Sequence, residues 1–213
     1  MTQGQIEVLN KLRATDKELL QKYSKVFFLN ENYIPSALAS VTPTFVWDNK
    51  KSLRIHSDVQ PFLEKMMRDA ALKARPLLLV SAYRSFSDQT VLKSSYSMSF
   101  GNGANKFSAD QGYSEHQLGT TVDFTSPSLG ASYTSFAGSD SYQWLLDNAY
   151  KYGFVLSYPK NNSYYVFEPW HWRFVGIVLS AKLHQEGKNF YDLEQRDIDQ
   201  YLIDIFELKD TMQ

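Results

Sequence analysis

The stretch YYVFEPWHWRFVG, residues 164–176, contains a first pair of residues that could do chemistry together. Glu168 and His171 lie three positions apart with Pro169 between them. A carboxylate and an imidazole at this spacing suit a catalytic metal site, with one side chain as base and the other as ligand. In a regular strand the two would point to opposite faces. Because proline interrupts a strand and favours an extended residue before it, we expect a turn that brings both side chains to one cleft.

A second motif, SEHQLGTTVDFT, places His116 and Asp123 in the form His-x-x-Gly-x-x-x-Asp. Together with His171 they supply two imidazoles and one carboxylate. Three such ligands leave the fourth position of a tetrahedral zinc ion (Zn2+) open to water, as in catalytic rather than structural zinc sites. Glu168 would then be the general base that takes the proton of that water.

Each of these residues also has an ordinary structural interpretation, because a single buried histidine or acid is more often a hydrogen-bonded core residue. Their occurrence together favours the metal site. The other two of the four histidines are expected to be structural: His56 precedes a predicted helix, and His184 lies on the polar side of another.

Composition excludes several other kinds of site. Cysteine is absent, so disulfides, thiolate ligands and cysteine nucleophiles are ruled out. Lys+Arg number 22 against 23 Asp+Glu without a basic block, which argues against a nucleic-acid or anionic-membrane surface. No apolar run approaches the roughly 18 residues of a membrane helix. The segment MTQGQIEVLN lacks a basic region followed by an apolar one, so it is not expected to be a signal peptide.

The hydrophobic pattern predicts the elements that carry these motifs. Apolar runs and alternation predict four strands, at residues 77–80, 121–125, 154–156 and 164–167. Helical spacing predicts helices at residues 5–23, 57–75, 87–97, 139–152, 172–185 and 191–206. Ser57 is expected to cap the second of these helices, and Gly153 to end the fourth. Residues 30–43 and 102–112 are expected to form loops, the latter near the mouth of the site.

These elements predict one α+β domain, with a small, mainly antiparallel sheet, helices packed on one face and the zinc cleft on the other. Residues 1–50 would form a helical arm and a wrapping loop, and residues 51–213 the catalytic domain. Tyr83 and Arg84 follow a buried strand, at a position where substrate contacts tend to lie. Trp170 and Trp172 are expected to form walls of the cleft, although packing explains aromatic residues equally well.

Three motifs in this order, SAYRSFSDQ, SEHQLGTTVDF and EPWHWRFVG, resemble the D-alanyl-D-alanine carboxypeptidases of the vancomycin-resistance type. The L,D-carboxypeptidases that trim peptidoglycan stems belong to the same group. Both are LAS zinc peptidases, with lysostaphin-type enzymes and the hedgehog signalling domain as distant relatives. The resemblance covers roughly residues 33–176.

The resemblance implies roles for individual residues. Positions matching His116, Asp123 and His171 bind zinc in that family, and the position matching Glu168 is the base. The arginine matching Arg84 contacts the scissile carbonyl or its oxyanion. The residues matching Ser114 and Gln89 help to hold the C-terminal portion of the substrate.

Two positions depart from the family pattern. Thr121 replaces an alanine that is common before the aspartate, which we expect to be harmless. Ser157, in GFVLSYP, replaces an arginine of many relatives. The second change is expected to alter how the end of the substrate is recognised.

The activity implied by the resemblance is zinc-dependent removal of the C-terminal D-alanine from peptidoglycan stem peptides or their precursors. Alternatives with the same chemistry are an L,D-carboxypeptidase acting on tetrapeptides and a peptidoglycan endopeptidase. A zinc-bearing binding module without turnover and a metal-free structural domain are further alternatives. The implied protein is an extracytoplasmic monomer in the periplasm or cell wall, although the apparent lack of a signal peptide leaves a cytoplasmic location open.

Overall fold

The computed structural model describes residues 25, 29–100, 108–130, 132–160, 162 and 165–199. The predicted helix at residues 5–23 lies outside this part of the chain, as do the end of the helix predicted at 191–206 and the first part of the loop predicted at 102–112. Among the described residues, no helix is long and apolar enough to cross a membrane.

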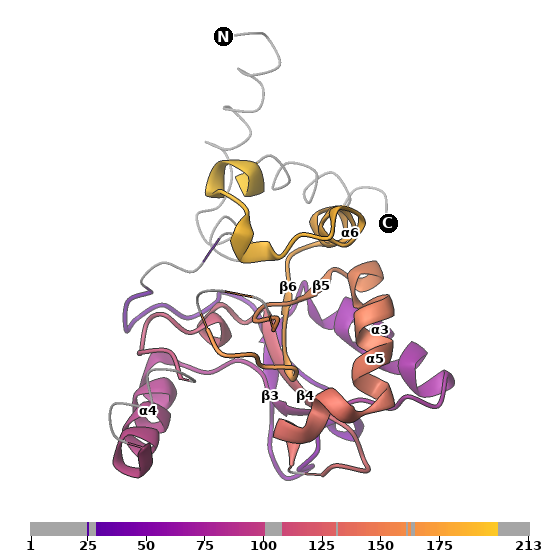
Figure 1. Cartoon of the computed structure of the whole chain (residues 1–213). Helices are drawn as coiled ribbons and strands as arrows, with labels where there is room; N and C mark the ends of the chain where they lie inside the picture. Colours follow the sequence, from indigo (N-terminus) through magenta and orange to yellow (C-terminus); the bar gives the residue numbers. More distant parts are fainter. Residues whose placement is uncertain are drawn as a thin grey trace, which may run out of the picture.

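A four-stranded antiparallel sheet lies at the centre of the fold, as predicted (Figure 1). Its spatial order is β3 (Leu78–Ser81), β4 (Thr121–Thr125), β6 (His171–Phe174) and β5 (Phe154–Leu156). A separate ladder pairs β1 (Leu38–Ser40) with β2 (Arg54–His56). The predicted strands at residues 121–125 and 154–156 have the predicted bounds, and β3 begins one residue later than predicted.

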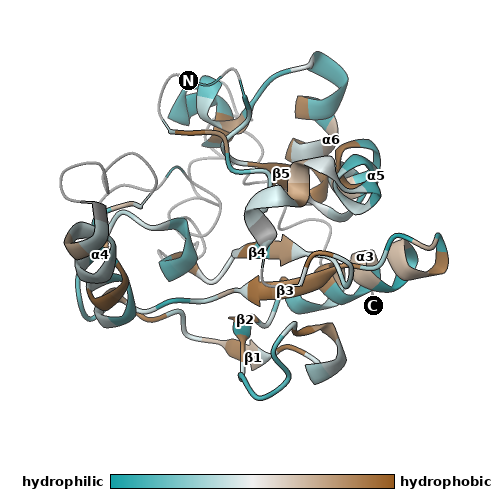
Figure 2. Ribbon diagram, turned by 60° about the horizontal axis from the view of Figure 1, so that its bottom comes forward, coloured by the Kyte–Doolittle hydropathy of each residue, from teal (hydrophilic) through white to brown (hydrophobic). Residues whose placement is uncertain are grey.

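One face of the sheet packs on the main hydrophobic core. Because side chains alternate along a strand, Val122 and Phe124 of β4 share this face with Trp172 and Phe174 of β6. Helices α3 (Gln60–Leu72) and α5 (Asp140–Asn148) cover it, and β3 is mostly brown, the colour of hydrophobic residues, in Figure 2. The opposite face carries the polar residues of the same strands, so the α+β prediction is confirmed.

The start of α3 differs from the prediction. The helix begins at Gln60, and its N-cap is Val59, which makes no side-chain capping bond, so the prediction of a Ser57 cap was wrong. Proline in the first turn explains the later start, because its fixed φ suits that position and it needs no hydrogen-bond acceptor. His56 is buried, and its Nδ1 accepts a hydrogen bond from the Asp58 N–H at 3.1 Å, consistent with a structural role.

The second half of the chain differs more from the predicted elements. The described residues 165–167 are not a strand, although a strand was predicted at 164–167. The last strand is instead β6, whose residues 172–174 were predicted to begin a helix, and α6 (Ile177–Glu186) begins five residues later than predicted. The physical reason is the turn at Pro169, after which the chain pairs with β4 and alternates its side chains between two faces. Helix α5 ends at Asn148, and a 3-10 turn, η5 (Ala149–Tyr152), completes the predicted span before Gly153.

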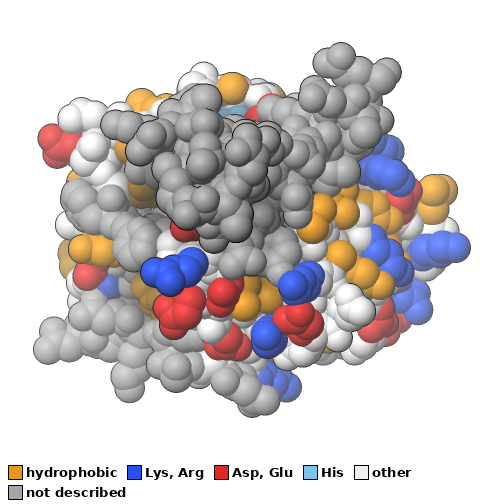
Figure 3. All heavy atoms as spheres, turned by 90° about the horizontal axis from the view of Figure 1, so that it is seen from above, with side chains coloured by type: hydrophobic (Ala, Val, Ile, Leu, Met, Phe, Trp, Pro, Cys, Tyr) orange, Lys and Arg blue, Asp and Glu red, His pale blue; other side chains and the backbone are white. Residues whose placement is uncertain are grey.

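A second, smaller layer follows the sheet at the C-terminal end. It contains α6, the 3-10 turn η6 (Phe190–Asp192) and helical residues 195–199. Its buried apolar cluster, which packs against Val155 of β5, consists of Val175, Leu179, Leu183, Phe190 and Ile198. Figure 1 shows this layer in orange and yellow, beyond the ends of β5 and β6. On the described part of the surface seen in Figure 3, acidic and basic side chains are interspersed.

Candidate metal centre

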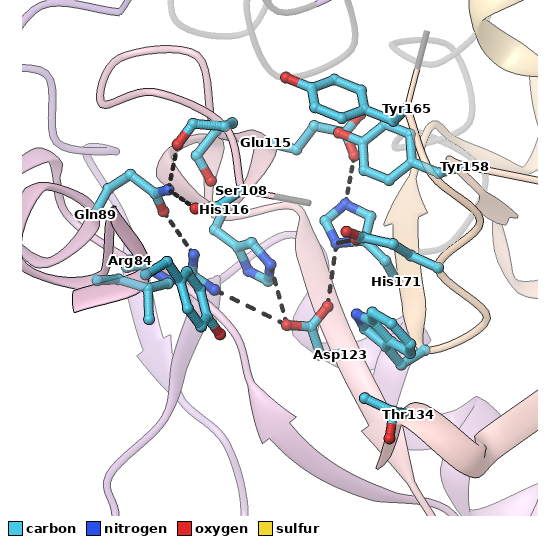
Figure 4. A pocket seen from close by; sticks show the side chains of 16 residues that line it. Arg84, Gln89, Ser108, Glu115, His116, Asp123, Thr134, Tyr158, Tyr165 and His171 are labelled. Carbon is cyan, nitrogen blue, oxygen red and sulfur yellow. Dashed lines mark hydrogen bonds and ion pairs between the residues drawn. The ribbon is translucent and has the colours of Figure 1, made fainter. Parts of the chain in front are cut away.

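Three side chains converge from three elements of the polar face. His116 comes from a 3-10 turn, η3 (Glu115–Leu118), Asp123 from the middle of β4, and His171 from the first position of β6. Asp123 and His171 are direct cross-strand partners. One candidate ligand atom from each residue lies within 4.8 Å of the other two, and all three side chains are buried (Figure 4).

A hydrogen bond from one nitrogen of each imidazole directs the other nitrogen toward Asp123. His116 donates from Nδ1 to the Ala82 carbonyl at 2.7 Å, and its Nε2 lies 3.3 Å from Asp123 Oδ2. His171 donates from Nε2 to Glu115 Oε2 at 2.7 Å, and its Nδ1 lies 3.1 Å from Asp123 Oδ1. Two imidazole nitrogens and one carboxylate therefore face a common point, an arrangement that fits a divalent metal such as zinc.

The charge states follow from burial and from these contacts. Burial lowers the pKa of His116, which leaves Nε2 unprotonated at neutral pH. Burial also opposes charge on His171, but hydrogen bonds with Asp123 and Glu115 outweigh it and raise the pKa of His171 to about 10. A metal binding at this site must therefore displace a proton from His171.

Glu168 is brought to the same site by the turn after it. The His171 N–H donates to the Glu168 carbonyl at 3.1 Å, and Glu168 Oε2 lies 3.7 Å from His171 Nδ1. Burial raises the pKa of Glu168 to about 7. A buried carboxyl that titrates near neutrality is suited to accepting and returning a proton.

Arg84 reaches the site from the segment after β3. Its Nη2 donates to Ser81 Oγ at 3.1 Å and lies 3.9 Å from Asp123 Oδ2, and its Nη1 donates to Gln89 Oε1 at 2.6 Å. Gln89, on α4 (Phe86–Phe100), is almost fully buried and donates in turn to the Ala109 carbonyl at 2.7 Å. The amide of Gln89 thus joins Arg84 to the wall of the cleft.

The other predicted site residues divide into two groups. Ser114 and Trp170 line the same cleft as the metal-binding group, whereas Trp172 packs in the main core on the other face of the sheet, so its predicted place in the cleft wall was wrong. Tyr83 is not among the residues that line it; its ring lies 5.3 Å from the Arg54 guanidinium instead. Ser157 also does not line the cleft, and its buried hydroxyl has no hydrogen-bond partner among the described residues.

The cleft itself has a volume of about 320 Å³. Besides the residues already described, it is lined by Leu92, Tyr96, Ser108, Ala109, Glu115, Thr134, Tyr158 and Tyr165. Its walls therefore combine aromatic rings with polar groups, as expected for a site that binds a small peptide.

Sequence reasoning missed the residues that support His171. Glu115 and Arg173 are fully buried, and Tyr158 stacks on the His171 ring with 4.7 Å between centroids. The sequence does contain an indication for two of these residues, Glu115 and Arg173. Glu115 adjoins a ligand, and Arg173 lies two positions after His171, on the same face of a strand. No local signal marked Tyr191, whose hydroxyl donates to Glu115 at 2.6 Å from a distant part of the chain.

The fold and the site define a class of protein: a small α+β domain with a three-ligand metal centre beside a buried carboxylate. Residues 52–177 match the family model of VanY, the D-alanyl-D-alanine carboxypeptidases. This match covers more than half of the chain, so the protein belongs to that family, as its motifs predicted.

Relatives of known name agree with this assignment. The chain is 36% identical over 177 residues to YodJ of Bacillus subtilis (strain 168), a protein named as a carboxypeptidase, in an alignment covering 80% of this chain and 64% of that one. It is 35% identical over 123 residues to a D-alanyl-D-alanine carboxypeptidase of Enterococcus faecium, covering 56% of this chain and 36% of the relative. The chain thus spans less than two thirds of the length of these relatives.

Two solved structures share the fold. The LD-carboxypeptidase LdcB superposes with a TM-score of 0.71 at 28% identity, covering 86% of each chain. A variant of the D,D-pentapeptidase VanY from a VanB-type resistance cassette, solved with Zn(II), superposes with a TM-score of 0.67 at 23% identity, covering 83% of this chain and 98% of that one.

Proposed function

We propose that this protein is a zinc-dependent carboxypeptidase that removes the C-terminal D-alanine from peptidoglycan stem peptides. The observation that carries the proposal is the convergence of His116, Asp123 and His171 beside Glu168 in one cleft, in a chain of the VanY family. The names of the relatives, which include D-alanyl-D-alanine carboxypeptidases, support the substrate class.

In this mechanism His116, Asp123 and His171 hold the metal. Zinc, when bound, would supply a Lewis acid for the carbonyl of the substrate and lower the pKa of a water molecule. Glu168 accepts the proton of the attacking water and returns it to the amine of the departing D-alanine. Its pKa of about 7 and its position 3.7 Å from a metal ligand suit both transfers.

The remaining side chains bind and orient the substrate. The Arg84 guanidinium faces the negative charge that develops on the carbonyl oxygen, a stabilisation worth roughly 3–4 kcal/mol per donor in other acyl-transfer sites. Gln89 holds Arg84 in place through its 2.6 Å hydrogen bond. Ser114, two residues before a ligand, offers a hydroxyl in the cleft for the substrate carboxylate, and Trp170 forms part of the wall.

A second candidate is an L,D-carboxypeptidase acting on tetrapeptide stems, favoured by the similarity to LdcB over 86% of both chains. The same residues would perform the same chemistry, since the two activities differ only in the bond that is cut. Peptidoglycan lies outside the cytoplasmic membrane, so either activity places the protein in the periplasm or cell wall. We propose that residues 51–213 act there as a monomeric catalytic domain.

A release assay followed by mass spectrometry tests these candidates. The zinc-loaded protein is incubated with muropeptides ending in D-Ala-D-Ala and, separately, with tetrapeptides ending in a single D-Ala, with and without a chelator. Chelator-sensitive loss of one D-alanine from the pentapeptide is the expected result. Release from the tetrapeptide alone would assign the L,D activity, and release from neither would contradict the carboxypeptidase proposal.

A further inference from the structure

Behind His171, on the side away from the candidate metal position, lies a carboxylate that the mechanism does not use. The side chain of Glu115 has no exposed surface. Its Oε2 accepts a hydrogen bond from His171 Nε2 at 2.7 Å, and its Oε1 accepts from Arg173 Nη1 at 2.9 Å and from the Tyr191 hydroxyl at 2.6 Å. The imidazole separates Glu115 from the point where the ligand atoms converge, so Glu115 acts on the metal site through His171.

A carboxylate in this position fixes a metal-binding histidine. It keeps a proton on Nε2, so that the proton displaced by a metal is the one on Nδ1, and it holds the plane of the ring. Arg173 makes the buried charge of Glu115 tolerable, because the two side chains form an ion pair with no exposed surface on either partner. The Arg173 guanidinium in turn lies 4.8 Å from the centre of the Phe190 ring, in the C-terminal layer.

Tyr191 connects the same layer to the metal site by two routes. Its hydroxyl donates a hydrogen bond to Glu115. Its ring also stacks on the ring of Tyr158, with 6.1 Å between centroids, and Tyr158 in turn stacks on His171. A capping box formed by Asn189 and Asp192 fixes the short turn that carries it. Tyr191 lies beyond residue 177, where the match to the family model ends.

From these contacts we propose that Tyr191 and Glu115 are positioning residues for the metal ligand His171, and that the C-terminal layer is therefore part of the metal site. The proposal deepens the proposed function and rests on its metal centre. Because metal binding is measured without substrate, the proposal can fail or hold independently of the peptide that is cleaved.

The test is the zinc affinity of Tyr191→Phe, measured by competition with a chromophoric chelator. This variant keeps the ring and removes only the hydroxyl. We expect zinc to bind about tenfold more weakly, at the lower end of the effect of removing an outer-shell partner. The matched control is Tyr152→Phe, which removes a hydroxyl that donates to Asp69 at 2.7 Å, away from the cleft. It should bind zinc with wild-type affinity.

A double variant shows whether Tyr191 acts through Glu115. Glu115→Gln alone should weaken zinc binding roughly 10- to 100-fold, and adding Tyr191→Phe to it should cause little further loss, because residues in one network are not additive. Melting curves in chelator verify that each variant folds; if Tyr191→Phe does not, Glu115→Gln decides the outcome. Unchanged affinity in the Glu115 or Tyr191 variant, equal loss in Tyr152→Phe, or fully additive losses would each overturn the proposal.

Discussion

At the residue scale, the site depends on the hydrogen bond that each histidine makes on the side away from the metal. His116 uses Nδ1 for the Ala82 carbonyl and His171 uses Nε2 for Glu115, so different nitrogens of the two rings face Asp123. A neutral imidazole has only one lone pair, and the outer hydrogen bond decides where it points. The ligand geometry is therefore set by residues that do not touch the metal.

Glu168→Gln should abolish turnover and leave the metal in place. The amide has nearly the same shape but cannot accept a proton, and loss of a general base lowers rates by about 10²- to 10⁴-fold. Glu168 is outside the three-residue ligand group, so zinc content measured by elemental analysis should stay at the wild-type level. Near-normal activity in this variant would show that another group is the base.

Gln89→Ala should lower kcat/KM by roughly 10- to 100-fold, because Arg84 loses the hydrogen bond that positions it, and a lost partner of a charged group costs about 1–3 kcal/mol. Steady-state kinetics on the D-Ala-D-Ala peptide measures the effect. Thr90→Ala is the matched control, since the Thr90 hydroxyl donates to the Phe86 carbonyl within the same helix and Thr90 does not line the cleft. If Gln89→Ala behaved like the control, Arg84 would not depend on this support.

At the element scale, the register of β4 against β6 assembles the site. Asp123 lies directly opposite His171, and a shift of one residue would move either side chain to the core face. The pairs Val122–Trp172 and Thr121–Arg173 fix this register, because one face is apolar and buried and the other holds the polar network. The core therefore determines the geometry of the metal ligands.

Gly153→Ala tests the junction between η5 and β5. Gly153 has φ 86°, and a methyl group there would collide with the buried ring of Phe174. We expect a loss of roughly 2–5 kcal/mol in the free energy of unfolding, from left-handed strain of about 1–2 and overpacking of about 1–3 kcal/mol. Urea denaturation measures it.

The control for this prediction is Gly187→Ala. Gly187 also has a positive φ, 63°, but an added methyl group would meet no atom of the described residues within 4 Å. Gly187→Ala should therefore lower the free energy of unfolding only by the cost of left-handed backbone strain, about 1–2 kcal/mol. Equal losses at the two positions would show that Phe174 moves aside without penalty.

At the scale of the whole molecule, the sheet lies between two layers with different roles. The main core on α3 and α5 stabilises the strands, and the C-terminal layer packs beside the polar face that carries the site. The two layers contact the same strand, β6, through alternate side chains: Trp172 and Phe174 on one side and Arg173 on the other. Metal binding at this strand should therefore stabilise both layers against unfolding.

Zinc should raise the melting temperature of the metal-free protein. A ligand at 100 times its Kd stabilises by about 2.7 kcal/mol, which corresponds to roughly 5–10 °C for a chain of this length. Differential scanning calorimetry with and without zinc measures the shift. His171→Ala, which removes a ligand, should show almost none; an equal shift in that variant would place the stabilising metal elsewhere.

The sequence by itself determined the class of fold and the residues of the candidate metal centre. The ligand types and Glu168 lie in two short motifs whose chemistry is visible without the structure, and the strand at 121–125 shows its alternation over five residues. Pro169 also indicated the turn that brings Glu168 beside His171. These features are local, so propensity and spacing were sufficient to find them.

Only the tertiary structure decided what surrounds that centre. The segment after Pro169 is a strand because β4 offers it a partner, although its apolar residues also fit a helix. Tyr83 turns out to lie outside the lining of the cleft, while Gln89 bonds Arg84 and Tyr191 bonds Glu115 across 76 positions of the chain. Contacts of this kind depend on how distant elements pack, and no local pattern in the sequence specifies that.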